Sequence, residues 1–111
     1  MLTEQPILIT SIQCKEAGGV LKNRFIRFDG TNGLEGAKSL GVVNADTNVN
    51  EYVPVTVKGI ALIEAGGPIS MGSAIESFDD GMAAPLTSGT LEGYALDSAS
   101  SAGQLIRILL S

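Results

Sequence analysis

The stretch Tyr52-Val53-Pro54-Val55-Thr56-Val57-Lys58 alternates apolar and polar residues, which predicts a β-strand. Successive side chains of a strand point to opposite faces, so the three valines would share one buried face. Pro54 cannot donate a backbone hydrogen bond, which places this end of the strand at a sheet edge or beside a bulge. We therefore expect an all-β fold built around this strand.

The valine strand closes a unit whose pattern occurs twice in the chain. Each unit has an Asp-Gly turn, a short strand that begins near a glycine, a polar loop and an apolar closing strand. The segments are Phe28-Asp29-Gly30, Leu40-Gly41-Val42-Val43-Asn44-Ala45-Asp46 and the valine strand, then Phe78-Asp79-Asp80-Gly81, Leu91-Glu92-Gly93-Tyr94-Ala95-Leu96-Asp97 and Leu105-Ile106-Arg107-Ile108-Leu109-Leu110. Two copies are too few for a solenoid. The pattern predicts a compact small β-barrel or sandwich made of two similar halves.

The repeat, at about residues 20–63 and 70–110, predicts equivalent turns and one shared core. Gly30 and Gly81 should hold equivalent turn conformations, and Gly41 and Gly93 equivalent strand positions, because glycine accepts positive φ and close backbone approach. The side chains expected in the core are Val53, Val55, Val57, Phe28, Phe78, Ile106 and Ile108.

The length of 111 residues fits a single domain that needs no disulfide to bury a core. We expect one β domain at residues 18–111, preceded by an extended N-terminal arm at residues 1–17. Residues 1–6 are polar and end in a proline, as expected of an arm, whereas residues 7–14 form a candidate first strand. That strand could pair with a neighbouring subunit on assembly, or be a core strand of its own subunit.

Composition and charge narrow the class of protein. The chain has 14 glycines, 5% aromatic and 17% charged residues, which is typical of short strands and tight turns. No apolar run approaches a membrane span and no secretory signal is evident, so a soluble protein made in the cytoplasm is expected. The net charge of −5 argues against nucleic-acid binding. The charge is uneven, because residues 1–38 sum to +1 and residues 39–111 to −6, which leaves open either chance clustering or a polarised contact surface.

The sequence offers no catalytic, cofactor-binding or metal-binding residue. Cys14 is the only cysteine and histidine is absent, which excludes an intrachain disulfide, Cys/His catalysis and the usual zinc sites. Other motifs have structural interpretations: turns at Asp79-Asp80, Gly18-Gly19 and Gly66-Gly67-Pro68, loop residues at Ser98, Ser100 and Ser101, and core or interface positions at Tyr52 and Tyr94. We expect a protein that is not an enzyme and has no small-molecule substrate.

The repeated unit resembles the capsid cement or decoration proteins of tailed bacteriophages. The motifs that carry the resemblance are the Arg27-Phe28-Asp29-Gly30 entry, Leu40-Gly41-Val42-Val43-Asn44-Ala45-Asp46, Val53-Pro54-Val55-Thr56-Val57-Lys58-Gly59 and Gly103-Gln104-Leu105-Ile106-Arg107-Ile108-Leu109-Leu110. The resemblance covers residues 18–111.

The resemblance implies a structural protein of the virion, made in the bacterial host cytoplasm and located on the outer capsid surface. It implies binding to the major capsid protein, often as a homotrimer, and stabilisation of contacts between capsid subunits. It implies no catalytic residue, cofactor, nucleic acid or membrane. The alternative is a non-enzymatic adhesion or carbohydrate-binding β module of a phage fibre or cell surface, although the absence of tryptophan speaks against it.

Overall fold

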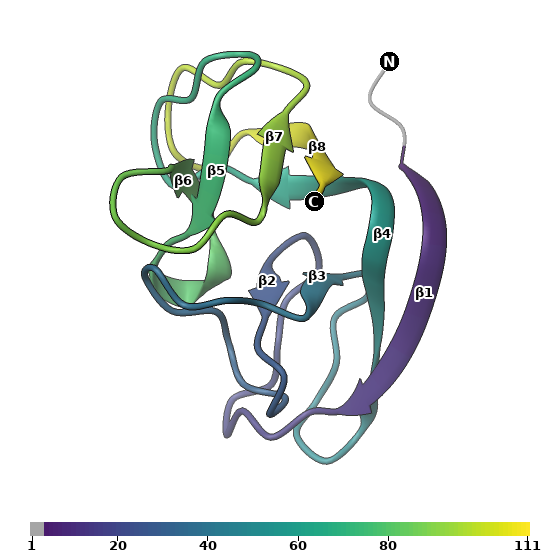
Figure 1. Ribbon diagram of the computed structural model, residues 1–111. Coiled ribbons are helices and arrows are strands. Elements are labelled where there is room, and N and C mark those ends of the chain that lie inside the picture. Colours follow the sequence, from purple (N-terminus) through teal and green to yellow (C-terminus); the bar gives the residue numbers. More distant parts are fainter. Residues whose placement is uncertain (1–3) are drawn as a thin grey trace.

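The computed structural model describes residues 4–111 and is almost entirely β-structure (Figure 1). Its single helical element is a one-turn 3-10 helix, η1. The elements are β1 (Gln5–Gln13), β2 (Phe25–Ile26), β3 (Gly41–Val43), β4 (Tyr52–Glu64), β5 (Ala74–Ser77), η1 (Asp79–Gly81), β6 (Ala83–Pro85), β7 (Gly93–Ala95) and β8 (Leu105–Leu110). Within the described residues, no helix has the length and apolar character needed to cross a membrane.

All eight strands belong to one antiparallel sheet. Seven of them follow the order β2-β3-β4-β8-β7-β5-β6, and β1 pairs with β4. The long strand β4 bends, so that its first part lies beside β1 and β3 while its last part pairs with β8 (Figure 1). The bend curls the sheet into a compact, barrel-like body with a radius of gyration of 12.3 Å.

The two halves repeat the same hydrogen-bonded register, as the sequence predicted. In the first half, β2 pairs with β3 and β3 with the first part of β4; in the second half, β5 pairs with β7 and β7 with β8. The matching pairs are Phe25–Val42 and Ala74–Tyr94, Ile26–Gly41 and Ile75–Gly93, Val42–Thr56 and Tyr94–Leu109, and Val43–Val55 and Ala95–Ile108. The predicted fold of two similar halves is therefore confirmed.

The four glycines singled out by the repeat occupy matching positions. Gly30 and Gly81 both have positive φ, +84° and +77°, and each N–H donates to the carbonyl three residues earlier. Gly41 opens β3 and Gly93 opens β7. A Cβ at either would lie 2.2 or 2.3 Å from a carbonyl oxygen of the neighbouring strand, so only glycine permits this close approach.

The strand β4 belongs to both halves. Its first part is the closing strand of the first half, and its last part is the opening strand of the second half. The opening strand of the first half is β1, because Gln13 pairs with Tyr52 as Glu64 pairs with Leu105. We call residues 5–58 the first half and residues 59–110 the second half.

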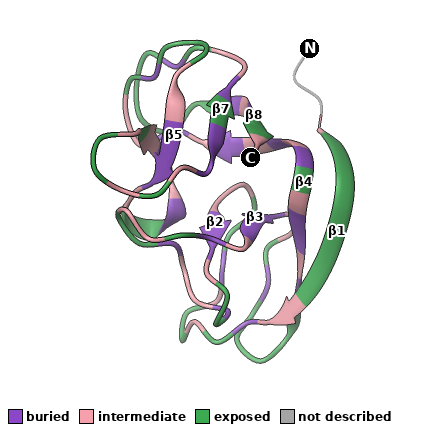
Figure 2. Cartoon of the chain, in the orientation of Figure 1, coloured by how far each residue is buried: buried purple, intermediate pink, exposed green. Residues whose placement is uncertain are grey.

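The N-terminal stretch lies in the sheet of its own chain. The strand β1 begins at Gln5, so Gln5 and Pro6, expected in a polar tip at residues 1–6, belong to the sheet. Residues 1–3 of that expected tip lie outside the described residues. Pairing with β4 runs from Gln5 to Gln13 with two register shifts. Most of β1 is nevertheless exposed, as Figure 2 shows.

The apolar core is divided into two clusters, and the second cluster includes Phe25 and Val42 of the first half. The first contains Cys14, Val20, Ile26, Val43, Val53 and Val55, with Ile12, Leu40 and Val57 packed against it. The second contains Phe25, Val42, Ala61, Ile63, Ala65, Ile69, Ile75, Ala83, Ala95, Ala99, Ile106 and Ile108. The prediction of a single core joining Val55 to Ile106 was wrong, because β4 bends and presents its inward side chains to two separate clusters.

Phe28 is the other correction to the predicted core. It was expected to be buried, but its residue is 65% exposed. The turn of the first half is closed by a hydrogen bond from the Gly30 N–H to the Arg27 carbonyl, and Phe28 lies at its corner. In the second turn, the Gly81 N–H donates to the Phe78 carbonyl in the same way. Phe78 therefore matches Arg27, and the sequence match of Phe78 with Phe28 was wrong by one residue. Phe78 itself is half-buried.

Candidate capsid-binding surface

The described residues contain neither a detectable pocket nor a cluster of three or more potential metal-binding side chains. A site on this protein is therefore a surface.

The residues weighed for chemistry lie in the core or in turns. Cys14 is buried and free. Asp79 and Asp80 are exposed on η1, where Asp80 has a φ of 61°. The Ser98 hydroxyl accepts a hydrogen bond from a backbone N–H at 3.0 Å, and Ser100 bonds to a glutamine side chain. These contacts shape loops.

The two tyrosines lie on outward faces of the sheet. Tyr52 is 69% exposed and Tyr94 is 45% exposed. The interpretation of these residues as core is therefore wrong, and their interpretation as interface residues stays open. Tyr52 lies on β4 in the first half and Tyr94 on β7 in the second half.

A buried carboxylate ties the two halves together. Glu92, at the edge of the second half, is buried and accepts hydrogen bonds from Lys38 Nζ and the Ser39 N–H, each at 2.9 Å. Both donors lie in the loop before β3. The sequence analysis missed this contact, although the signal exists: in the repeat, Glu92 occupies the position of the apolar Leu40, and both N–H groups donate to the matching strand.

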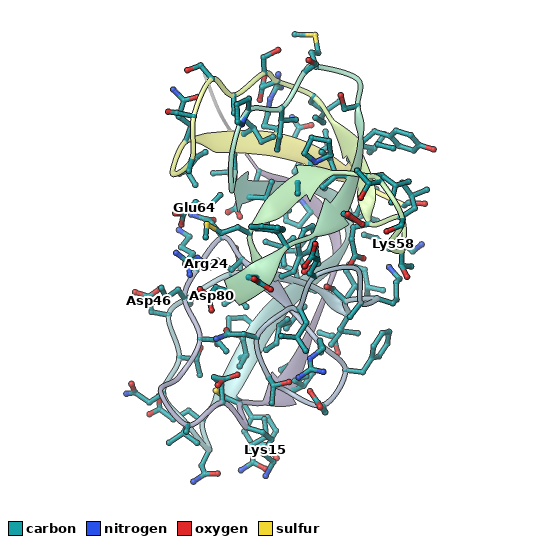
Figure 3. The ribbon with its side chains drawn as sticks, turned by 90° about the vertical axis from the view of Figure 1, so that its left-hand side faces the viewer. Lys15, Arg24, Asp46, Lys58, Glu64 and Asp80 are labelled. Atoms are coloured by element: carbon teal, nitrogen blue, oxygen red, sulfur yellow. The ribbon has the colours of Figure 1, made fainter. Side chains whose placement is uncertain are left out.

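A second ion pair joins the halves on the face shown in Figure 3. Arg24 donates from Nε and a terminal nitrogen to Glu64 Oε1, both at 3.3 Å. The Glu64 N–H also donates to the Asn23 carbonyl at 2.9 Å. These contacts and the Glu92 contact fasten the two halves to one another.

Two carboxylates are held ionised by local donors. The Arg107 side chain and its N–H donate to Asp97 at 2.9–3.0 Å and lower the pKa of Asp97 from 3.8 to about 2. Hydrogen bonds from the Thr31 side chain and backbone likewise lower the pKa of Asp29. Both acids fasten loops next to strands.

The most exposed large apolar residue of the described chain, Ile7, lies on β1 next to two other exposed apolar residues. We define the β1 edge as Ile7, Leu8 and Ile9, which are 82%, 53% and 47% exposed. Among the residues that the structure describes, the strand pairs with β4 alone, so its other edge has free backbone donors and acceptors. A strand edge that also carries apolar side chains is a template for binding a second polypeptide.

The sequence matches the family of phage cement proteins over residues 5–110. The chain belongs to that family. No curated protein sequence matches it. Among solved structures, the base of the bacteriophage phi29 head fiber, the gp8.5 N base, is similar, with a TM-score of 0.77, 21% identity, and coverage of 94% of this chain and 95% of that chain. At this identity the likeness concerns the fold.

Membership of the family confirms the resemblance found in the sequence. The cement protein is a structural component of the virion and is located on the capsid. The surface described above, with no pocket among the described residues, is the kind that such a role requires.

Proposed function

We propose that this cement protein binds the major capsid protein on the outside of the phage head and stabilises contacts between neighbouring capsid subunits. It acts as a homo-oligomer, with a trimer favoured, and has no catalytic activity. The observation that carries the proposal is the β1 edge, an open strand edge with exposed apolar side chains on a rigid body.

Strand edges suit this task. Pairing through main-chain hydrogen bonds gives affinity without a pocket, and the side chains at Ile7 and Ile9 add apolar contacts to the capsid. Each contact can be weak, because an oligomer presents several copies at once and the second contact forms at a high effective concentration. Within each copy, the ion pairs between the halves hold the capsid-binding strand edge in a fixed position relative to the rest of the molecule.

The test is binding to expanded empty heads. Wild-type protein and the double variant Ile7→Ser/Leu8→Ser would be mixed with heads, which are then sedimented to measure occupancy. We expect the double variant to lose most of its occupancy. The control Met71→Ser replaces another apolar residue, 67% exposed, in a loop of the second half, and it should bind like wild type. Equal occupancy of all three proteins would refute the role of the β1 edge, and no binding by wild type would refute the proposed function.

The second candidate is a carbohydrate-binding module. The exposed Tyr52 and Tyr94 favour it, because sugar sites use exposed aromatic rings. The same preparation would be tested on a glycan array in parallel with the heads. Glycan binding that Tyr52→Ser abolishes, together with no head binding, would support this candidate instead.

A further inference from the structure

One sheet face is buried in the first half and open in the second. In the first half the face carries Val42 and Thr56, which are each 2% exposed. The matching residues of the second half are Tyr94 and Leu109, which are each 45% exposed. We define the open face as Tyr94 and Leu109 on β7 and β8. Two large apolar side chains thus stand where the repeat has a covered surface.

What covers the face in the first half is the second half of the same chain. Phe25 and Val42 lie on that face, and both belong to the core cluster of the second half. The β2 backbone also lies against the η1 turn, since a Cβ at Gly81 would be 2.4 Å from the Phe25 carbonyl oxygen. The internal contact is therefore head-to-tail: the face of one half meets the turn of the next.

If the open face of the second half is covered in the same way as the face of the first half, its partner is the turn of a following half. It would be the turn of a third half, which the chain does not have. The matching turn is Arg27 to Gly30 in the first half of another copy, because Gly30 repeats the positive φ and the hydrogen bond of Gly81. At the corner of that turn Phe28 is 65% exposed. Each copy thus has one open face and one turn with an exposed Phe28 corner. Gly30 itself is buried against the Gln13 carbonyl of its own chain, so the turn can meet another copy only through Phe28.

We propose that the open face of one copy binds the Phe28 turn of a second copy. This deepens the homo-oligomer part of the proposed function and rests on it. A head-to-tail contact uses two different surfaces, so it can close into a ring such as a cyclic trimer.

Net charge favours this contact over a two-fold one. Residues 59–111 carry six acidic and one basic side chain, whereas residues 1–58 carry six of each. A two-fold contact through the open face would place two second halves, each with net charge −5, against one another. The head-to-tail contact places the acidic half against a neutral one, which costs less electrostatic free energy.

The contact between copies should be looser than the contact within the chain. Inside the chain, Gly33 approaches Gly81 closely, with an ideal Cβ only 3.0 Å from the Gly81 Cα. In the second half Leu86 takes the place of Gly33, because both N–H groups donate to the matching strand, and its side chain keeps the neighbour further away. We therefore expect reversible association that depends on concentration.

The experiment measures molar mass by analytical ultracentrifugation from micromolar to millimolar protein. Wild type should rise from the 11.4 kDa monomer towards a closed oligomer. The face variant Tyr94→Thr/Leu109→Thr and the turn variant Phe28→Ser should each stay monomeric. The control Leu21→Thr removes a residue 51% exposed and should associate like wild type. Thermal melting of every variant checks that it is folded.

Mixing the two monomeric variants decides between head-to-tail and two-fold contacts. The face variant keeps an intact turn and the turn variant keeps an intact face, so a mixture should form one-to-one dimers. A monomeric wild type, an unchanged mass of either variant, or a mixture that stays monomeric would overturn the proposal. Occupancy on empty heads, measured on the same samples, is a separate readout: a wild type that is monomeric in solution and still binds heads would overturn this contact and leave the proposed function standing.

Discussion

Replacing Val55 by aspartate should unfold the whole domain. Val55 is fully buried in the core of the first half, where its neighbours are apolar side chains and Cys14. Losing the buried valine costs about 2 kcal/mol. Keeping the new carboxyl neutral at pH 7 means raising its pKa by about 3 units, or about 4 kcal/mol. The sum of about 6 kcal/mol is comparable with the total stability of a small domain, 5–15 kcal/mol.

The assay is thermal unfolding followed by circular dichroism and calorimetry. Because β4 runs through both halves, Val55→Asp should remove the cooperative transition of the second core as well as the first. The matched control is Lys58→Asp, an exposed position on the same strand, which should shift the transition little. A cooperative melt of Val55→Asp near the wild-type temperature would refute the reasoning. A surviving transition of half the enthalpy would show that the two halves fold independently.

Three further predictions test the contacts between elements. Glu92→Ala leaves the Ser39 N–H without its acceptor and should cost about 2–3 kcal/mol in urea unfolding, whereas Glu92→Gln should cost less. Arg107 lowers the pKa of Asp97 from 3.8 to about 2, so this carboxylate stabilises the fold fully above about pH 4. Its contribution, about 1 kcal/mol after solvent screening, is lost as the pH falls towards 2. Asp97→Asn should flatten that part of the pH–stability curve, and an unchanged slope would contradict this. Deleting residues 1–13 removes β1 and should lower the melting temperature of the free protein, whereas unchanged melting would identify the stretch as an arm that orders only on a partner.

The fold class followed from local patterns that tertiary structure did not override. The alternation around Val55 and the Asp-Gly turns predicted the strands and the two halves, because strand period and glycine turns are set by the backbone alone. The place where one half ends and the next begins was harder. The sequence analysis put it near Gly66-Gly67-Pro68, but β4 continues through Gly59 from one half into the other.

The surface was less predictable than the core. Phe28 was expected inside because an aromatic residue beside a strand is usually buried, and only the turn geometry shows that it points outwards. The exposure of Ile7 depends on the position of β1 at the end of the sheet, and Glu92 finds its partners in a loop far away in sequence. Such long-range arrangements leave little trace in a local pattern.

The bend in β4 has a mechanical consequence for a protein located on the capsid. A strand of 13 residues crosses the molecule, and its one glycine, Gly59, lies at the bend with a φ of +99°. A glycine at this position could act as a hinge, but the β1 backbone packs closely against Gly59. A Cβ there would lie 2.6 Å from the Gln5 carbonyl oxygen and 2.7 Å from the Ile7 nitrogen. A force on one half is therefore transmitted to the other half through a continuous strand, because no flexible linker separates the halves.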